Sequence, residues 1–194
     1  MNKKLLFVLF GLLLTICIRQ VEGGDLQKPT GWIADYAGVI DDSSYQRINS
    51  TIQELEQKTG AEIAVVSIKN IGNDSIEDFS VKLFKKWGIG KKGKDNGIML
   101  ISSIEDKKVK IEVGYGLEGI LPDGLCGEIL DKDVVPYFKK GEYGNGMAEG
   151  VFAIASAIAK DAGIELTCQV NIKVSQENRT TLFGLLFKIL FLVI

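Results

Sequence analysis

The sequence has no histidine, only three prolines and three cysteines among its 194 residues. Without imidazole, the chain cannot form serine–histidine–aspartate or cysteine–histidine catalytic arrangements, histidine-ligated zinc sites or histidine pH switches. It also lacks an excess of one charge, because the net charge is −2 and acidic and basic residues are interspersed. No basic face therefore indicates nucleic-acid binding. Any chemistry must come from carboxylates, amides, hydroxyls or lysine.

The N-terminal segment has the composition of an export signal. Two lysines precede an apolar run from Leu5 to Ile18, and Gly23 supplies the small residue that suits cleavage before Gly24. An uncleaved membrane anchor is the alternative, although the run is shorter than the ~20 residues of a spanning helix. We predict a signal peptide over residues 1–23 and a linker over residues 24–29. Under both interpretations the folded part is exported, to a periplasmic or extracellular location.

Removal of the signal leaves two cysteines, Cys126 and Cys168. A disulfide can persist in an exported protein. Separation along the sequence does not report distance in space, so a disulfide and two separate thiols both remain open.

The hydrophobic pattern predicts alternating strands and helices between residues 30 and 165. A capping box of Ser43 and Gln46 starts one helix, which Gly60 ends, and Ser75 caps a second helix that ends at Gly88. Buried strands are expected over residues 61–68 and 96–103, a hairpin partner over 107–114, a broken helical stretch over 122–140 and a helix over 145–162. This order predicts an α/β fold with a small mixed sheet between helical layers.

The C-terminal part has two further segments. Residues 166–174 alternate apolar and polar side chains, so residues 166–181 form either an edge strand or a linker. Residues 182–194 are apolar except for Gly184 and Lys188. As a helix this tail spans only about 20 Å, against about 30 Å of hydrocarbon. It is expected to lie on or partly in a membrane, or to be a spanning helix cut short.

Two glycine patterns resemble nucleotide-binding loops but fail on context. "GIGKKGKD" has Asp95 where a phosphate loop needs a hydroxyl, and it joins a helix to a strand instead of a strand to a helix. "GYGLEG" follows a strand, but Pro122 and its neighbours intervene before a helix can begin. We therefore predict no nucleotide cofactor. Gly114, Gly116 and Gly119 are expected to let the backbone turn sharply or approach another group, with positive φ angles.

Four segments in this order, "ADYAGVID", "KDNGIMLI", "KIEVGYGLEGILPD" and "FKKGEYGNGMAEGV", resemble the TPM domain family. The resemblance covers about residues 30–165. It implies a three-layer α/β/α sandwich and divalent-cation binding, with calcium in some relatives. It also implies acid phosphatase activity, by way of a plant thylakoid relative, or a role as an accessory subunit, as in a relative that assists an acetylcholine receptor. Function diverges on this fold.

The acidic residues of these motifs are the candidate metal ligands. They lie in loops or at strand ends, where they are expected to converge at one edge of the sheet. The set is Asp35, Asp95, Asn96, Glu118 and Asp123, beside a binding loop of Gly114, Tyr115, Gly116 and Gly119. Hard oxygen ligands favour calcium, then magnesium, and we predict no zinc. Structural roles remain open: a turn cap for Asp35, side-chain-to-backbone turns for Asp95 and Asn96, and a helix N-cap for Asp123.

Two functions fit these residues. The favoured one is a membrane-associated binding or accessory module that uses a divalent cation and meets a membrane surface or a membrane protein. The alternative is a metal-dependent acid phosphatase acting on phosphate esters. The first is favoured because the acidic motifs contain no clamp for phosphate. The nearby lysines, Lys91, Lys92 and Lys94, are expected to form a solvated turn.

Overall fold

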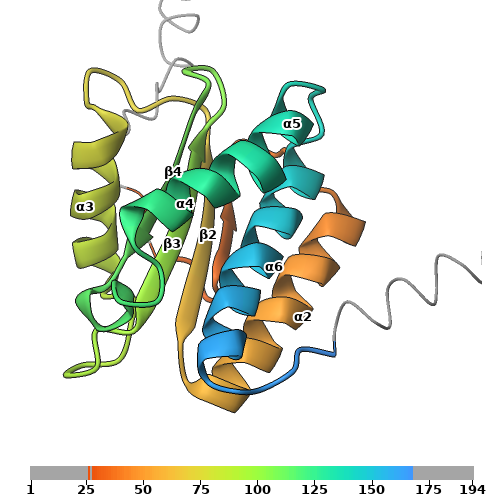
Figure 1. Ribbon diagram of the computed structural model, residues 1–194. Coiled ribbons are helices and arrows are strands. Elements are labelled where there is room, and N and C mark those ends of the chain that lie inside the picture. The colour runs from red at the N-terminus through yellow and green to blue at the C-terminus, as the bar shows by residue number, and fades with distance from the viewer. Residues whose placement is uncertain (1–25, 27, 168–194) are drawn as a thin grey trace, which may run out of the picture.

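The computed structural model describes residue 26 and residues 28–167, and these residues form three layers (Figure 1). The middle layer is a four-stranded sheet in the order β1-β2-β3-β4. Its strands are β1 (Ile33–Asp35), β2 (Glu62–Ile68), β3 (Gly97–Ser103) and β4 (Lys108–Val113). The first three are parallel, and β4 runs antiparallel to β3. The predicted α/β class and mixed sheet are confirmed.

One face of the sheet is covered by α2 (Asp42–Thr59) and α6 (Tyr143–Asp161), with α4 (Asp123–Ile129) beside them (Figure 1). Ile48 and Ile52 of α2 and Val151 and Ile154 of α6 are buried against Leu100 and its neighbours. The two helices run in the same direction, because side chains near the start of α2 meet residues near the start of α6. Both helices therefore begin at the same end of the sheet.

The opposite face is covered by α3 (Ile76–Trp87) (Figure 1). Phe79 and Leu83 are buried there against Met99 and Ile101. Leu26 lies beside the C-terminal end of α3, since the Trp87 indole N–H donates to the Leu26 carbonyl at 3.2 Å.

The helix boundaries follow from capping residues. Ser75 caps α3 by accepting a hydrogen bond from the Asp78 N–H at 3.0 Å, and Gly60 and Gly88 end their helices in the left-handed conformation, as predicted. The cap of α2 is different from the prediction. Asp41 and not Ser43 is the N-cap, because its carboxylate accepts hydrogen bonds from the Ser43 and Ser44 N–H groups.

The stretch predicted as a broken helix consists of three consecutive pieces: α4, the π-helical segment η2 (Leu130–Val134) and α5 (Val135–Phe138). The irregular segment thus lies just before Pro136. None of the helices within the described residues is long and apolar enough to cross a bilayer. The leader, residue 27, Cys168 and the apolar tail over 182–194 lie outside the described residues, as does most of the proposed edge strand.

Candidate functional site

The carboxyl edge of the sheet is the place where open α/β sheets usually bind ligands. Here β1, β2 and β3 end at Asp35, Ile68 and Ser103. The N-termini of α2 and α6 lie at this same edge, as do the β3–β4 hairpin and the junction between α5 and α6. We call the opposite end, where β2 and β3 begin and β4 ends, the amino edge.

A row of polar residues crosses three strands at the carboxyl edge. Asp35, Ser67 and Ser102 occupy paired register positions. They lie on the face covered by α2 and α6, because Val65 and Leu100, two residues earlier, are in that core. A weak signal for this row is present in the sequence, because Ser67 and Ser102 each lie one residue before the end of a mostly apolar strand.

Asp35 makes hydrogen bonds with the backbone of the loop that follows it. Its carboxylate accepts hydrogen bonds from the Val39 N–H at 3.1 Å and the Ile40 N–H at 2.9 Å. The Ser67 hydroxyl donates to the same carboxylate. The turn-capping role left open for Asp35 is therefore the one found.

Ser102 is the exception in this row. It is fully buried, and within the described residues its hydroxyl is the one buried side-chain polar atom with no hydrogen-bond partner. Burial without a partner costs on the order of 1–3 kcal/mol. The register pairs Ser102 with Val109 of β4 on the same face of the sheet.

A pocket of about 560 Å³ is lined by Val109 of this pair, but not by Ser102. One wall is the β3–β4 hairpin with Ile104, Lys107 and Val109, and the other is the α5–α6 junction with Val135, Phe138, Lys139 and Tyr143. The rings of Phe138 and Tyr143 pack edge to face, with centroids 5.1 Å apart. The walls are thus largely apolar. Lys107 and Lys139 are exposed.

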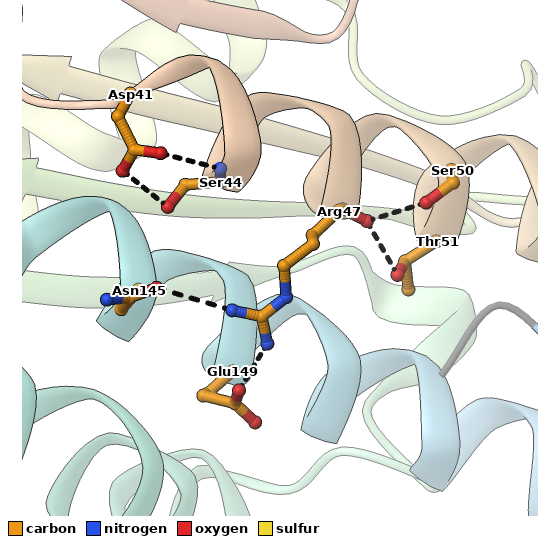
Figure 2. Close-up of polar contacts among 7 residues, drawn as sticks. All are labelled: Asp41, Ser44, Arg47, Ser50, Thr51, Asn145 and Glu149. Carbon is orange, nitrogen blue, oxygen red and sulfur yellow. Dashed lines mark hydrogen bonds and ion pairs between the residues drawn. The ribbon is translucent and has the colours of Figure 1, made fainter. Parts of the chain in front are cut away.

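The N-termini of α2 and α6 are packed together (Figure 2). The Asp41 carboxylate accepts hydrogen bonds from the Ser44 N–H at 3.0 Å and the Ser44 hydroxyl at 2.7 Å. A hydrogen bond from the Ser43 hydroxyl, and then those from Ser44, hold the pKa of Asp41 well below its usual range. A Cβ atom on Gly144 would lie 2.8 Å from the Ser44 hydroxyl oxygen, so only glycine fits there.

Arg47 joins the same two helices (Figure 2). Its guanidinium donates to the Asn145 side-chain oxygen at 3.3 Å and pairs with the Glu149 carboxylate. Asp133 of η2 is close enough to Glu149 for the two negative charges to repel each other. Burial, and then the charge of Glu149, raise the pKa of Asp133.

The structure does not bring the predicted site residues to one edge. Asp95 and Asn96 precede β3 and Glu118 follows β4, so they lie at the amino edge, whereas Asp35 ends β1 at the carboxyl edge. Strand β2 has seven residues, and the two edges are therefore about 20 Å apart. The expected convergence is wrong for Asp35 because the short β1 pairs in parallel with the second half of β2.

Asn96 has a structural role. Its side-chain oxygen accepts a hydrogen bond from the Lys91 N–H at 2.9 Å, and its amide donates to the Gly60 carbonyl at 2.8 Å. It thus joins the turn after α2 to the loop before β3. The side-chain-to-backbone role left open for Asn96 is confirmed.

Two glycines of the predicted binding loop permit close backbone approach. The Gly116 N–H donates to the Asp95 carbonyl at 3.0 Å and the Gly114 N–H to the Gly97 carbonyl at 2.8 Å. A Cβ atom on Gly116 would clash with the Lys94 carbonyl oxygen. Close approach is therefore confirmed for both, and positive φ is wrong for both. Gly119 shows neither feature.

The other predicted residues are exposed: Asp95, Tyr115 and Glu118 at the amino edge, and Asp123 at the start of α4. Tyr115 is 81% exposed and Asp95 has a φ of 48°. Asp123 is the first residue of α4, and its side chain does not cap the helix, so the N-cap role is wrong. Within the described part of the chain, no group of three or more histidine, cysteine or acidic side chains is arranged to hold a metal ion.

These features define an α/β/α sandwich with a pocket at the carboxyl edge. At the amino edge, the loop before β3 and the loop after β4 are joined by backbone hydrogen bonds. The model of the TPM domain family matches residues 33–157, and the chain belongs to this family. No match was found among curated proteins.

Solved structures support the same fold. The N-terminal domain of a protein from P. gingivalis is 34% identical, with a TM-score of 0.63, and the match covers 68% of this chain and 84% of that one. BA42 from the psychrophilic bacterium Bizionia argentinensis is 21% identical, with a TM-score of 0.55 over 62% and 82% of the two chains. The N-terminal domain of cg2496 from Corynebacterium glutamicum is 14% identical, with a TM-score of 0.54 over 69% and 84%. The last two show the fold alone.

Proposed function

We propose that this TPM domain is an exported binding module that acts at a membrane and does not hydrolyse its ligand. The observation that carries the proposal is that the acidic side chains at the carboxyl edge hold backbone groups in place. Asp35 and Asp41 each accept hydrogen bonds from two backbone N–H groups and from serine hydroxyls. Their oxygens are committed to holding loops and helix ends.

The ionisation states of Asp106 and Cys126 favour binding over catalysis. A general acid or base works best with a pKa near the operating pH. Hydrogen bonds from Ser103 and from the Ile71 N–H lower the pKa of Asp106, so it stays ionised. Burial raises the pKa of the Cys126 thiol to about 11, which keeps it protonated and weakly nucleophilic.

A divalent cation, calcium before magnesium, belongs to the proposal at the amino edge. Asp95 and Glu118 are exposed there on two loops that the bond from Gly116 to Asp95 holds together. Carboxylates and backbone carbonyls are ligands that calcium prefers. Asp35 is not part of this cation site, because it lies at the carboxyl edge. Asn96 is not part of it either, because its side chain already makes hydrogen bonds with Lys91 and Gly60.

Membrane association is the other part of the proposal, and it rests on the sequence. The apolar leader and the apolar tail over residues 182–194 flank the folded domain. A partner would be a membrane surface or a membrane protein. Phosphate-ester hydrolysis is the alternative, for which the lysines beside Asp95 would have to bind phosphate.

One pair of measurements on the protein expressed from the full chain separates the two functions. We would measure hydrolysis of p-nitrophenyl phosphate and the melting temperature with calcium, magnesium or chelator, for the unmodified protein, Asp95→Ala and the exposed control Asp131→Ala. The proposal expects no turnover, and a melting temperature that calcium raises less in Asp95→Ala than in the other two. Metal-dependent turnover that Asp95→Ala abolishes would establish the hydrolase instead.

A further inference from the structure

We propose that the pocket between the β3–β4 hairpin and the α5–α6 junction binds a small organic anion with an apolar body. This goes beyond the proposed function, because the pocket lies at the carboxyl edge and the proposed cation lies at the amino edge. Two features of the pocket support the proposal: the apolar side chains of its walls and the lysines at its rim.

The walls suit an apolar body. Val109 comes from the hairpin side, and Val135, Phe138 and Tyr143 come from the helical side. The volume of about 560 Å³ lies within the range of roughly 300–1,000 Å³ that is usual for small-molecule sites. The edge-to-face packing of Phe138 on Tyr143 fixes both rings, so the helical wall is formed before a ligand arrives.

The rim supplies positive charge from two sides. Lys107 belongs to the hairpin and Lys139 follows α5, so the two lysines line the pocket from opposite walls. Within residues 28–167 neither takes part in an ion pair. The acid next to Lys107 is held by other groups, because the Asp106 carboxylate accepts hydrogen bonds from the Ser103 hydroxyl at 2.6 Å and the Ile71 N–H at 2.9 Å. Two lysines without paired acids favour an anion.

The buried hydroxyl of Ser102 is close to the pocket, because Ser102 pairs with Val109, but Ser102 is not one of the residues that line it. It is fully buried and has no partner in the described part of the chain, and it lies beside Val109 on the same face of the sheet. An orphaned polar group is costly unless a ligand or a water completes its hydrogen bonds. A water enclosed beside Val109 would do so, and Ser102 is therefore not counted among the features that favour a ligand.

The test uses the dye 8-anilinonaphthalene-1-sulfonate, which combines an aromatic body with one anionic group. N-phenyl-1-naphthylamine, which has the same body without the sulfonate, is the uncharged control. Binding is followed by fluorescence and by two-dimensional amide NMR of the full chain. We expect saturable binding of one dye, shifts of the Ile104, Lys107, Val109 and Gly141 amides, and at least tenfold weaker binding of the uncharged analogue.

Matched variants report on the rim. The double variant K107Q/K139Q should weaken dye binding about tenfold, whereas K108Q/K140Q, which moves each change one residue along the chain and outside the pocket, should leave it unchanged. Displacement of the dye by octanoate or by phenyl phosphate would show whether the anionic group is a carboxylate or a phosphate, and either result supports the proposal.

Several results would overturn it: no saturable binding, amide shifts outside the pocket, equal binding of the uncharged analogue, equal loss in both double variants, or displacement by neither anion. These outcomes are separable from a failure of the proposed function, because the calcium measurement with Asp95→Ala reports on the opposite edge. Circular dichroism of each variant would confirm that the fold is retained.

Discussion

Gly144 at the start of α6 lies against Asp41, the residue that caps α2. A Cβ atom on Gly144 would lie 2.9 Å from the Asp41 carboxylate and 2.9 Å from the Ser44 Cβ atom. The side chains of Asp41 and Ser44 therefore fill the space that a side chain at position 144 would need. This contact fixes the position of α6, and with it one wall of the pocket.

Gly144→Ala should destabilise the domain by about 1–3 kcal/mol, because the added methyl group must push the two helices apart. The matched control is Gly124→Ala in α4, where a Cβ atom meets no neighbour. That change should be neutral or stabilising, by up to about 1 kcal/mol, since alanine is the better helix former. Chemical denaturation of both variants makes the comparison. Equal stability of the two would contradict the close packing.

Gly116→Ala should separate the two loops of the amino edge. The new methyl group would clash with the Lys94 carbonyl oxygen, and the hydrogen bond from Gly116 to Asp95 would be lost. We expect a loss of about 1–3 kcal/mol, together with a loss of the calcium-induced rise in melting temperature. Gly119→Ala is the control, because a Cβ atom there meets open space. A calcium response that survives Gly116→Ala would remove these loops from the proposed cation site.

Ser67→Ala and Ser102→Ala should have opposite effects on stability, although the two serines are neighbours in the sheet. Ser67 donates to Asp35, so its removal leaves a carboxylate without that partner and should cost about 1–3 kcal/mol. Ser102 has no partner within the described residues, so its removal should be neutral or stabilising. Urea denaturation of the ligand-free protein would measure both. A clear loss of stability in Ser102→Ala would show that the hydroxyl is satisfied.

Asp133→Asn should stabilise the domain at pH 7 and lose this effect in acid. Burial and the charge of Glu149 raise the pKa of Asp133, so the folded protein binds this proton more tightly than the unfolded chain. Stability contributed by the protonated carboxyl is therefore lost as the pH rises through the raised pKa, and an uncharged amide avoids that loss. The exposed neighbour Asp131 provides the control Asp131→Asn.

Denaturation at pH 7 and at pH 3.5 measures the difference between the two variants. The advantage of Asp133→Asn should shrink at the lower pH, where Asp133 of the unmodified protein is protonated. An advantage that is the same at both pH values would show that packing, and not ionisation, is responsible.

Local signals in the sequence were sufficient for most of the fold. Ser75 and the closing glycines Gly60 and Gly88 mark helix ends, and the apolar runs of β2 and β3 mark buried strands. Each of these signals acts over a few residues, so a linear pattern contains it. The cap of α2 was misplaced by two positions because Asp41 and Ser43 are both good N-cap residues.

The edge at which each candidate side chain lies was not accessible from such signals. Strand β1 has three residues, too few to show an alternating pattern, and its parallel pairing with β2 sends Asp35 to the carboxyl edge. The pocket was missed for a related reason. Lys107 and Lys139 are far apart in the sequence, and they face one pocket only after the hairpin and α5 have packed on the same core.

The central claim is that the two edges of the sheet have separate roles, with a cation at the amino edge and an organic anion at the carboxyl edge. Amide NMR of the full chain, titrated first with calcium and then with 8-anilinonaphthalene-1-sulfonate, tests it most directly. The account predicts that calcium shifts the amides around Asp95 and Glu118 and that the dye shifts those around Lys107 and Val109. Calcium shifts centred on Asp35 and Asp106, or one set of amides responding to both additions, would contradict it.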